Sequence, residues 1–394
     1  MKVQRFYSVA LVLVVLMAIS APGGIRGQAV SSPGILLPYD GSEMTGLNLE
    51  GLLFSPSEIV PGILENPAGP AFLQSLSLTT GFAVDYTAAK FGPQIGLDTT
   101  IDQRSHRTGL TYSSLLLPFR LMKKPWAAAA AFNGRYSPIY ASNDYTLEYP
   151  IGEYSWEQSG NISSASLALS ARLFPRTGIG ISWTKWFGEW KEIVARSFES
   201  PVDDSRLTGA YDYTGQFLSL GFITALDRLT FGLAAYTPTD LMEGEQINQA
   251  AWRTDTTELH QTYHGALKAY IVYNLKPTLT FGIAYRYQEY ISSDHQLGYF
   301  TFDHKYGPST KLAVGVGYTP KFRHVRLPIY AAYTGHWMPV SEDYPPGEDE
   351  ASRFSGNLAL GMSVLSGRLG IHTAIHATRY NLHGTSYSPW PPWG

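Results

Sequence analysis

The feature that most constrains this chain is a long series of runs in which apolar and polar residues alternate. In the segment 278–291, TLTFGIAYRYQEYI, the odd-numbered positions from Leu279 to Tyr287 are large and apolar, whereas the positions between them are small or polar. A period of two is typical of a β-strand whose faces meet different surroundings. Thirteen such runs begin near residues 74, 107, 126, 162, 176, 213, 228, 263, 278, 310, 325, 354 and 368.

The connections between these runs alternate in length. The short connections are 173–177, 225–228, 274–278, 319–324 and 365–368, and the long ones lie near 88–105, 138–160, 190–211, 238–261, 291–308 and 338–353. Outer-membrane barrels sort their connections in this way, with short periplasmic turns and long extracellular loops. A soluble β-sandwich or propeller is the alternative, but it has no reason to separate short from long loops.

These patterns predict an all-β protein, a transmembrane antiparallel β-barrel over residues 73–394 with about 14 strands. Thirteen strands are clear. Pro389, Pro391 and Pro392 prevent a regular paired strand at the C-terminus. Either an irregular strand within 380–388 or 297–303 is the fourteenth, or the C-terminal hairpin is atypical.

The N-terminus has the three parts of a secretory signal peptide. Lys2 and Arg5 precede the apolar run 9–19, and small residues follow, with cleavage after Gly27 or Ala29. We therefore predict a signal peptide over residues 1–29; a membrane anchor is the alternative, although the apolar run is short for one. The chain has no cysteine, and its net charge of −3 does not favour a nucleic-acid partner.

Residues 30–72 differ from the rest of the mature chain. They are rich in Gly, Pro and Ser, carry isolated apolar residues and show no alternation. The segment is too apolar for a free disordered arm. We therefore predict an N-terminal hatch that plugs the lumen. Asn66 and Pro67 would redirect the chain into the wall, where Pro67 leaves no unpaired N–H.

The residues Asn66, Pro67, Ala68 and Gly69 resemble the motif that ends the hatch in the FadL-type family of outer-membrane transporters. This resemblance implies a barrel with an N-terminal hatch in the outer membrane of a Gram-negative-type bacterium. It also implies passive uptake of hydrophobic small molecules, such as long-chain fatty acids or hydrocarbons, through a lateral gap in the wall. Some related barrels do not transport, so a scaffold or partner of a secretion or surface-assembly system is the alternative function.

Cations outnumber acids among the ionisable residues that alternation places on the lumen face. Cations beside apolar lining could bind a fatty-acid carboxylate. They could instead pair with hatch acids such as Asp40 and Glu43, or be solvated. The projected set also contains Asp85, Arg172, His264, His372 and His376; the candidates for head-group binding are Arg135, Lys268, Arg286, Lys311 and Arg326.

No enzymatic activity, cofactor or metal site is expected. A hydrolase would need a nucleophile, a histidine and an acid in one cluster, and no motif singles out such a set. His372 and His376 share a strand face but lie about 13 Å apart, which is too far for one ion. The expected partners are outer-membrane lipid and a hydrophobic small-molecule ligand.

Overall fold

The computed structural model describes residues 66–73, 75–91, 101–136, 143–148, 151–198, 204–250, 253–289, 291–297, 300–306, 308–322, 325–337, 354–366 and 369–381. The predicted signal peptide and residues 30–65 of the predicted hatch lie outside this set. The only helical element among the described residues is the short 3₁₀ helix η1 (Gly69–Phe72). No helix in the described part of the chain has the length and apolar character needed to span a membrane.

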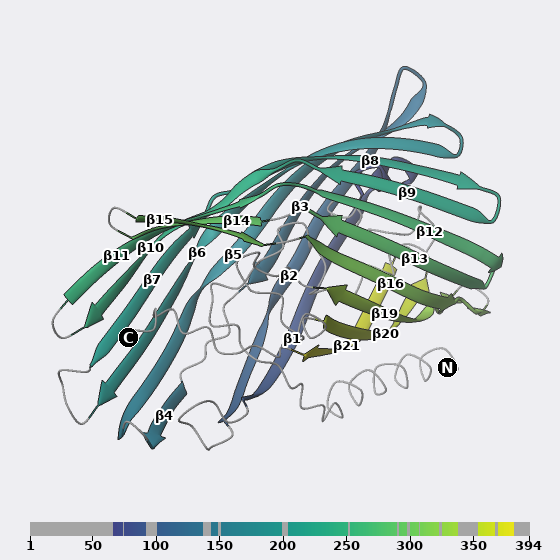
Figure 1. Cartoon of the computed structure of the whole chain (residues 1–394). Coiled ribbons are helices and arrows are strands. Elements are labelled where there is room, and N and C mark those ends of the chain that lie inside the picture. The colour runs from purple at the N-terminus through teal and green to yellow at the C-terminus, as the bar shows by residue number, and fades with distance from the viewer. Residues whose placement is uncertain are drawn as a thin grey trace.

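Thirteen strands form a continuous antiparallel wall in chain order (Figure 1). They are β1 (Ser77–Phe91), β2 (Ile101–Leu121), β3 (Lys124–Tyr136), β5 (Ile151–Phe174), β6 (Thr177–Phe198), β8 (Gln216–Leu226), β9 (Leu229–Tyr236), β12 (Ala266–Lys276), β13 (Leu279–Gln288), β16 (Ser309–Tyr318), β19 (Ile329–Trp337), β20 (Phe354–Ser366) and β21 (Leu369–Asn381). Each of the thirteen alternating runs of the sequence lies in one of these strands.

Several segments predicted as long loops are in fact strands, which corrects that prediction. They are β4 (Asn143–Glu148), β7 (Ser205–Tyr213), β10 (Thr239–Ala250), β11 (Arg253–Tyr263), β14 (Ile291–Leu297) and β15 (Phe300–Tyr306). The last five continue the sheet from the far half of β6 in the order β7, β10, β11, β14 and β15. We call these five strands the projecting sheet. Their sequences are mostly polar, with few large apolar residues such as the buried Tyr211, Tyr213, Met242 and Tyr263, so hydropathy does not reveal a clear strand period.

The first and last wall strands are the edges of the described sheet. Among the described residues, β1 pairs only with β2, and β21 pairs only with β20. Because an odd number of antiparallel strands separates them, β1 and β21 run in the same direction. The segment near 297–303 belongs partly to β15 of the projecting sheet and not to the wall. A fourteenth wall strand therefore stays a prediction.

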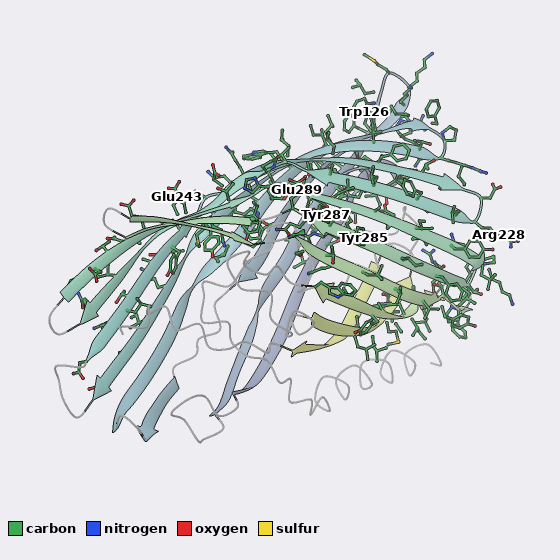
Figure 2. All side chains as sticks on the ribbon, in the orientation of Figure 1. Trp126, Arg228, Glu243, Tyr285, Tyr287 and Glu289 are labelled. Atoms are coloured by element: carbon green, nitrogen blue, oxygen red, sulfur yellow. The ribbon has the colours of Figure 1, made fainter. Side chains whose placement is uncertain are left out.

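The outward face of the wall is apolar, whereas the inward face combines small and polar residues with buried aromatic and apolar side chains (Figure 2). In β13, Phe281, Ile283 and Tyr285 are exposed, whereas Ala284 and Arg286 are buried. In β8 and β12, exposed and buried side chains alternate in the same way, with large apolar side chains on the exposed face. Large exposed apolar side chains on a continuous outward face are what a lipid-facing band requires.

Two small strands lie at the short-turn end of the wall. β17 (Lys321–Phe322) and β18 (Val325–Arg326) form a hairpin between β16 and β19. β18 also pairs with the end of β20, where Arg326 lies opposite Leu365. Every other described connection at this end is a tight turn, so this end of the wall is compact.

Candidate functional site

The end of the predicted hatch, residues 66–72, lies against the inner face of the wall, and we call it the junction. Asn66 is buried, and its Nδ2 donates hydrogen bonds to the carbonyl oxygens of Phe222 in β8 at 3.1 Å and Leu233 in β9 at 3.0 Å. Its Oδ1 accepts a hydrogen bond from the backbone N–H of Ala68 at 3.0 Å. One side chain therefore joins the junction to the backbone of two wall strands.

The junction backbone approaches the wall closely because glycines lie beneath it. A Cβ on Gly180 of β6 would lie 2.6 Å from the N atom of Ala68, and a Cβ on Gly221 of β8 would lie 2.9 Å from the same atom. A Cβ on Gly178 would lie 2.8 Å from the ring of Phe72. These separations are too short for real side-chain contacts. Gly178, Gly180 and Gly221 thus form a glycine seat that no larger residue can replace without movement.

An arginine holds the other end of the junction. Arg172 in β5 donates a hydrogen bond from Nη2 to the carbonyl oxygen of Phe72 at 3.2 Å, and its guanidinium carbon lies 5.1 Å from the centroid of the Phe72 ring. This geometry combines a charge-assisted hydrogen bond with a cation–π contact. The junction is therefore fastened at both ends, by Asn66 and by Arg172.

Three of the predicted head-group candidates lie side by side on adjacent wall strands. Lys268 of β12 is directly opposite Arg286 of β13, and Arg286 is directly opposite Lys311 of β16. Lys268 and Arg286 are buried, with exposed fractions of 7% and 8%, and Lys311 is half-buried. Arg286 also donates from Nη2 to Oε1 of Gln288 at 3.4 Å. We call Lys268, Arg286 and Lys311 the cation row.

The other two candidates lie elsewhere. Arg135 is near the end of β3, at a shift in the register with β5, and the structure does not describe its side chain. Arg326 is in β18 at the short-turn end, opposite Lys321 and Leu365. The structure therefore brings together three of the five candidates and separates two.

At Lys268 the cation row is flanked by two clusters of buried apolar side chains. Along β12, Ala266 belongs to the first cluster, Lys268 follows two residues later, and Tyr270 belongs to the second cluster. The first cluster is mainly aromatic and consists of Ile162, Trp186, Tyr211, Tyr213, Phe217, Ala234, Tyr236, Met242, Tyr263 and Ala266. Positive charge is thus placed between apolar surfaces on the inner face.

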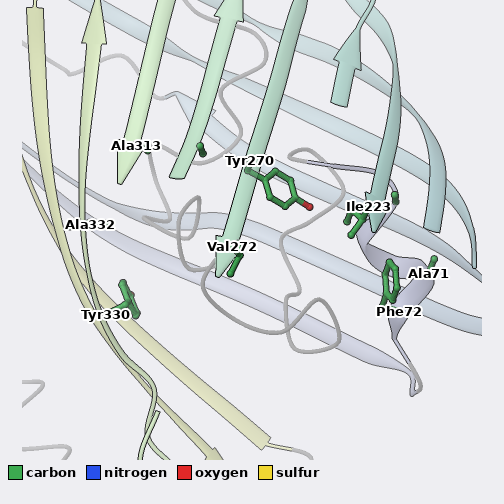
Figure 3. Close-up of a cluster of buried hydrophobic side chains, with 11 residues drawn as sticks. Ala71, Phe72, Ile223, Tyr270, Val272, Ala313, Tyr330 and Ala332 are labelled. Atoms are coloured by element: carbon green, nitrogen blue, oxygen red, sulfur yellow. The ribbon is translucent and has the colours of Figure 1, made fainter. Parts of the chain in front are cut away.

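The second cluster connects the cation row to the junction. In Figure 3, the ring of Tyr270 points from β12 toward Ile223 and Phe72, and the Tyr270 hydroxyl interacts with the side chain of Asn66. A Cβ on Gly232 of β9 would collide with the Tyr270 ring, which therefore lies flat against that strand. Sequence reasoning did not identify Tyr270 or the glycine seat. The available signal was the run of small residues at alternate positions of β6 and β8.

The described side chains contain no group of three His, Asp or Glu residues placed to hold a metal ion. His372 and His376 are in β21, and their side chains lie outside the described set. The buried polar chemistry that the structure does describe on the inner face consists of cations, hydroxyls and amides. Such groups can bind anions and polar head groups.

Comparisons with known proteins support a specific fold. No family model matches the chain, and no curated protein matches it. Among solved structures, a deletion mutant of the TodX monoaromatic hydrocarbon channel is 10% identical and has a TM-score of 0.55, with 80% of this chain and 87% of that chain covered. The toluene transporter TbuX of Ralstonia pickettii is 10% identical, with 82% and 92% covered and a TM-score of 0.47.

A further solved structure is a FadL homologue of Pseudomonas aeruginosa. It is 13% identical, with 84% of this chain and 96% of that chain covered and a TM-score of 0.41. The likeness to the TodX channel carries the conclusion, and at this identity it concerns the fold alone. The predicted all-β antiparallel class is confirmed, and its fold matches that of FadL-type outer-membrane barrels; barrel closure, the number of about 14 strands and the plugged lumen stay predictions.

Proposed function

We propose that this chain of FadL-type fold is an outer-membrane channel for the passive uptake of hydrophobic small molecules in a Gram-negative-type bacterium. The observation that carries the proposal is the cation row, whose Lys268 and Arg286 are buried and which adjoins two apolar clusters on the inner face of a wall whose outer face is apolar. Several solved structures of similar fold are named as toluene transporters or monoaromatic hydrocarbon channels. These names favour transport over an enzymatic role.

The predicted division of the chain gives each part a role in this proposal. Residues 1–29 direct export and are removed, and residues 30–72 form the hatch inside the barrel. The fastening of Asn66 and Phe72 to the wall supports this role, because it holds the C-terminal end of the hatch at the inner face. A ligand then passes between the hatch and the wall.

The cation row is the proposed site for the head group of an anionic amphiphile such as a fatty acid. A guanidinium or ammonium group forms strong charge-assisted hydrogen bonds to a carboxylate, especially away from water. The aromatic cluster beside Ala266 would contact the apolar part of the ligand. Pairing of the same cations with hatch acids is the competing role, and ligand binding would then exchange one carboxylate for another.

The function can be tested by uptake into cells. The full-length chain is expressed in a Gram-negative strain that lacks its own long-chain uptake channel, and the entry of labelled laurate and undecane is measured. A channel should speed entry of at least one compound relative to cells with an empty vector. If the protein reaches the outer membrane and neither compound enters faster, uptake of these hydrophobic compounds is not its function.

The projecting sheet favours a second candidate, a scaffold for surface assembly. Strands β7, β10, β11, β14 and β15 extend the sheet well beyond the lipid-facing band and carry exposed polar side chains such as Glu243 and Glu258 (Figures 1 and 2). Such a surface could bind another protein. Unchanged uptake together with loss of a surface protein in cells that lack this chain would favour the scaffold.

A further inference from the structure

The short-turn end of the wall carries an excess of exposed basic side chains. The exposed basic residues there are Arg120, Lys123, Lys124, Arg176, Arg228, Lys276 and Lys321. Among the described residues at this end, Asp227 is the one exposed acid, and its Oδ1 lies 2.6 Å from Nη1 of Arg176. The chain as a whole has a net charge of −3, so this excess is local.

Backbone hydrogen bonds join neighbouring turns from the β5–β6 turn to the end of β16. The N–H of Ala225 donates to the carbonyl oxygen of Arg176 at 2.8 Å, and the N–H of Asn274 donates to that of Arg228 at 2.7 Å. The N–H of Thr319 donates to the carbonyl oxygen of Thr278 at 2.8 Å. Arg176, Arg228, Lys276 and Lys321 thus lie in or next to turns that are joined through the backbone, whereas Arg120, Lys123 and Lys124 lie at the tight turn between β2 and β3. We call this set of turns the basic rim.

Large apolar side chains accompany the basic residues in the rim. Met122 is 87% exposed beside Lys123, and Phe322 is 57% exposed beside Lys321. Lys124 lies directly opposite Leu121, whose side chain belongs to the apolar outward face. Basic residues with long apolar stems and apolar neighbours suit a boundary between hydrocarbon and water, where the stem stays in the apolar layer and the charge reaches the head groups.

The opposite end of the molecule differs in charge. The projecting sheet exposes Glu243, Glu245 and Glu258, and Glu245 lies directly opposite Glu258. In Figure 2, Arg228 and Glu243 lie at opposite ends of the ribbon. Positive charge is therefore concentrated where the outward apolar band ends at the short turns, and not along the whole surface.

We propose that the basic rim binds anionic phospholipid head groups in the leaflet that surrounds the short-turn end. Phosphate is the matching group, since Lys and Arg near a membrane surface attract anionic lipids. A lipid fits better than a soluble acidic partner because the charges lie at the edge of the lipid-facing band, beside Met122 and Phe322. The inference rests on the proposed membrane placement, which puts the short-turn end at the periplasmic leaflet.

The test measures lipid selectivity directly. The full-length mature protein is reconstituted into nanodiscs that contain trace amounts of spin-labelled phosphatidylglycerol or spin-labelled phosphatidylcholine. Electron paramagnetic resonance then gives the motionally restricted fraction of each lipid. We expect a preference for phosphatidylglycerol of about fivefold, which should fall as salt is raised.

Two double variants that remove the same amount of charge test whether the basic rim causes the preference for phosphatidylglycerol. Lys123→Gln/Arg228→Gln should lower the preference by at least half, whereas Lys191→Gln/Arg206→Gln, in the part of the sheet beyond the lipid-facing band, should leave it unchanged. Heat-dependent gel mobility confirms that each variant is folded. Equal restriction of both lipids in the wild type, or an unchanged preference in the rim variant, would overturn the proposal.

A soluble partner gives a different result. Fluorescent polyglutamate is added to the wild type and to the rim variant in phosphatidylcholine nanodiscs. If polyglutamate binds only the wild type, and the wild type shows no preference for phosphatidylglycerol, the rim recognises a soluble acidic polymer and the lipid proposal is wrong. Uptake of laurate and undecane is measured on the same variants. Normal uptake with no lipid preference would reject this inference and leave the proposed function intact.

Discussion

The carboxamide nitrogen of Asn66 lies 3.1 Å from the carbonyl oxygen of Phe222, so the end of the predicted hatch is bonded directly to the backbone of a wall strand. A second bond from the same nitrogen reaches Leu233 on the neighbouring strand. Asn66 is buried, so these hydrogen bonds are shielded from bulk water. The attachment of the junction therefore depends strongly on this one side chain.

Replacing Asn66 should loosen the junction. Asn66→Ala leaves two backbone carbonyls and the Ala68 N–H without their partner, at a cost of roughly 1–3 kcal/mol for each buried unsatisfied group. We expect a lower unfolding temperature in detergent and greater entry of a bulky antibiotic into cells. Asn66→Asp is the informative companion, since it keeps the acceptor for Ala68 but loses both donors, and it should be nearly as harmful. Wild-type behaviour of both variants would contradict the role of the amide.

Filling the glycine seat should displace the junction backbone. In Gly180→Ala the new methyl group collides with the Pro67 carbonyl and with the N atom of Ala68, and overpacking of this kind costs about 1–3 kcal/mol. Limited proteolysis should then cut near residue 66 more readily. Ile181→Ala is the matched control, because it changes the same strand on its lipid-facing side. Equal protection of Gly180→Ala and the wild type would show that the seat tolerates a methyl group.

The Arg172 contact should contribute measurably to stability. Arg172→Gln removes a charge-assisted hydrogen bond to Phe72 and the contact with its ring, which together are worth about 2 kcal/mol. The midpoint of thermal unfolding, followed by circular dichroism, should fall. Arg176→Gln removes an exposed ion pair with Asp227 and should change the midpoint little. Equal shifts of the unfolding midpoint in the two variants would mean that the contacts of Arg172 with Phe72 add no more stability than an exposed ion pair.

Neutralising the cation row should distinguish anionic from neutral ligands. Arg286→Gln should weaken laurate binding about 10- to 100-fold, because charge-assisted hydrogen bonds contribute roughly 1.5–3 kcal/mol. Binding of undecane, which has no charge, should be nearly unchanged. Lys268→Gln and Lys311→Gln should follow the same pattern, and calorimetry in detergent would measure each affinity.

The two separated candidates serve as controls for that series. Arg326 lies at the short-turn end, so Arg326→Gln should leave laurate affinity near the wild-type value. Arg135→Gln tests the remaining candidate. Loss of both laurate and undecane binding in a variant would indicate a displaced hatch. If none of the five substitutions lowers laurate affinity, the lumen does not recognise a carboxylate, and a hydrocarbon channel or a scaffold is the better explanation.

The fold class was predictable because its main signal is local. A strand that separates lipid from lumen must alternate every two residues, and this pattern is visible in β13 or β20 without knowledge of any partner strand. The projecting strands were missed because most of their residues are polar, and the few buried apolar ones, such as Tyr211 and Tyr263, are too widely spaced to show a period. Alternation of apolar and polar residues identified the thirteen wall strands, where lipid imposes the pattern. The same rule missed the strands within the long loops, where no lipid does so.

The sequence by itself determined which residues face inward, including all three members of the cation row and the position of Asn66 at the start of the wall. Only the tertiary structure decided which inward residues meet. Lys268, Arg286 and Lys311 become neighbours through strand register, and Gly180 and Gly221 lie beneath Pro67 and Ala68 although they are distant in sequence. Register depends on hydrogen bonds between remote strands and on close packing across them, and a single strand does not reveal which remote residues it will meet.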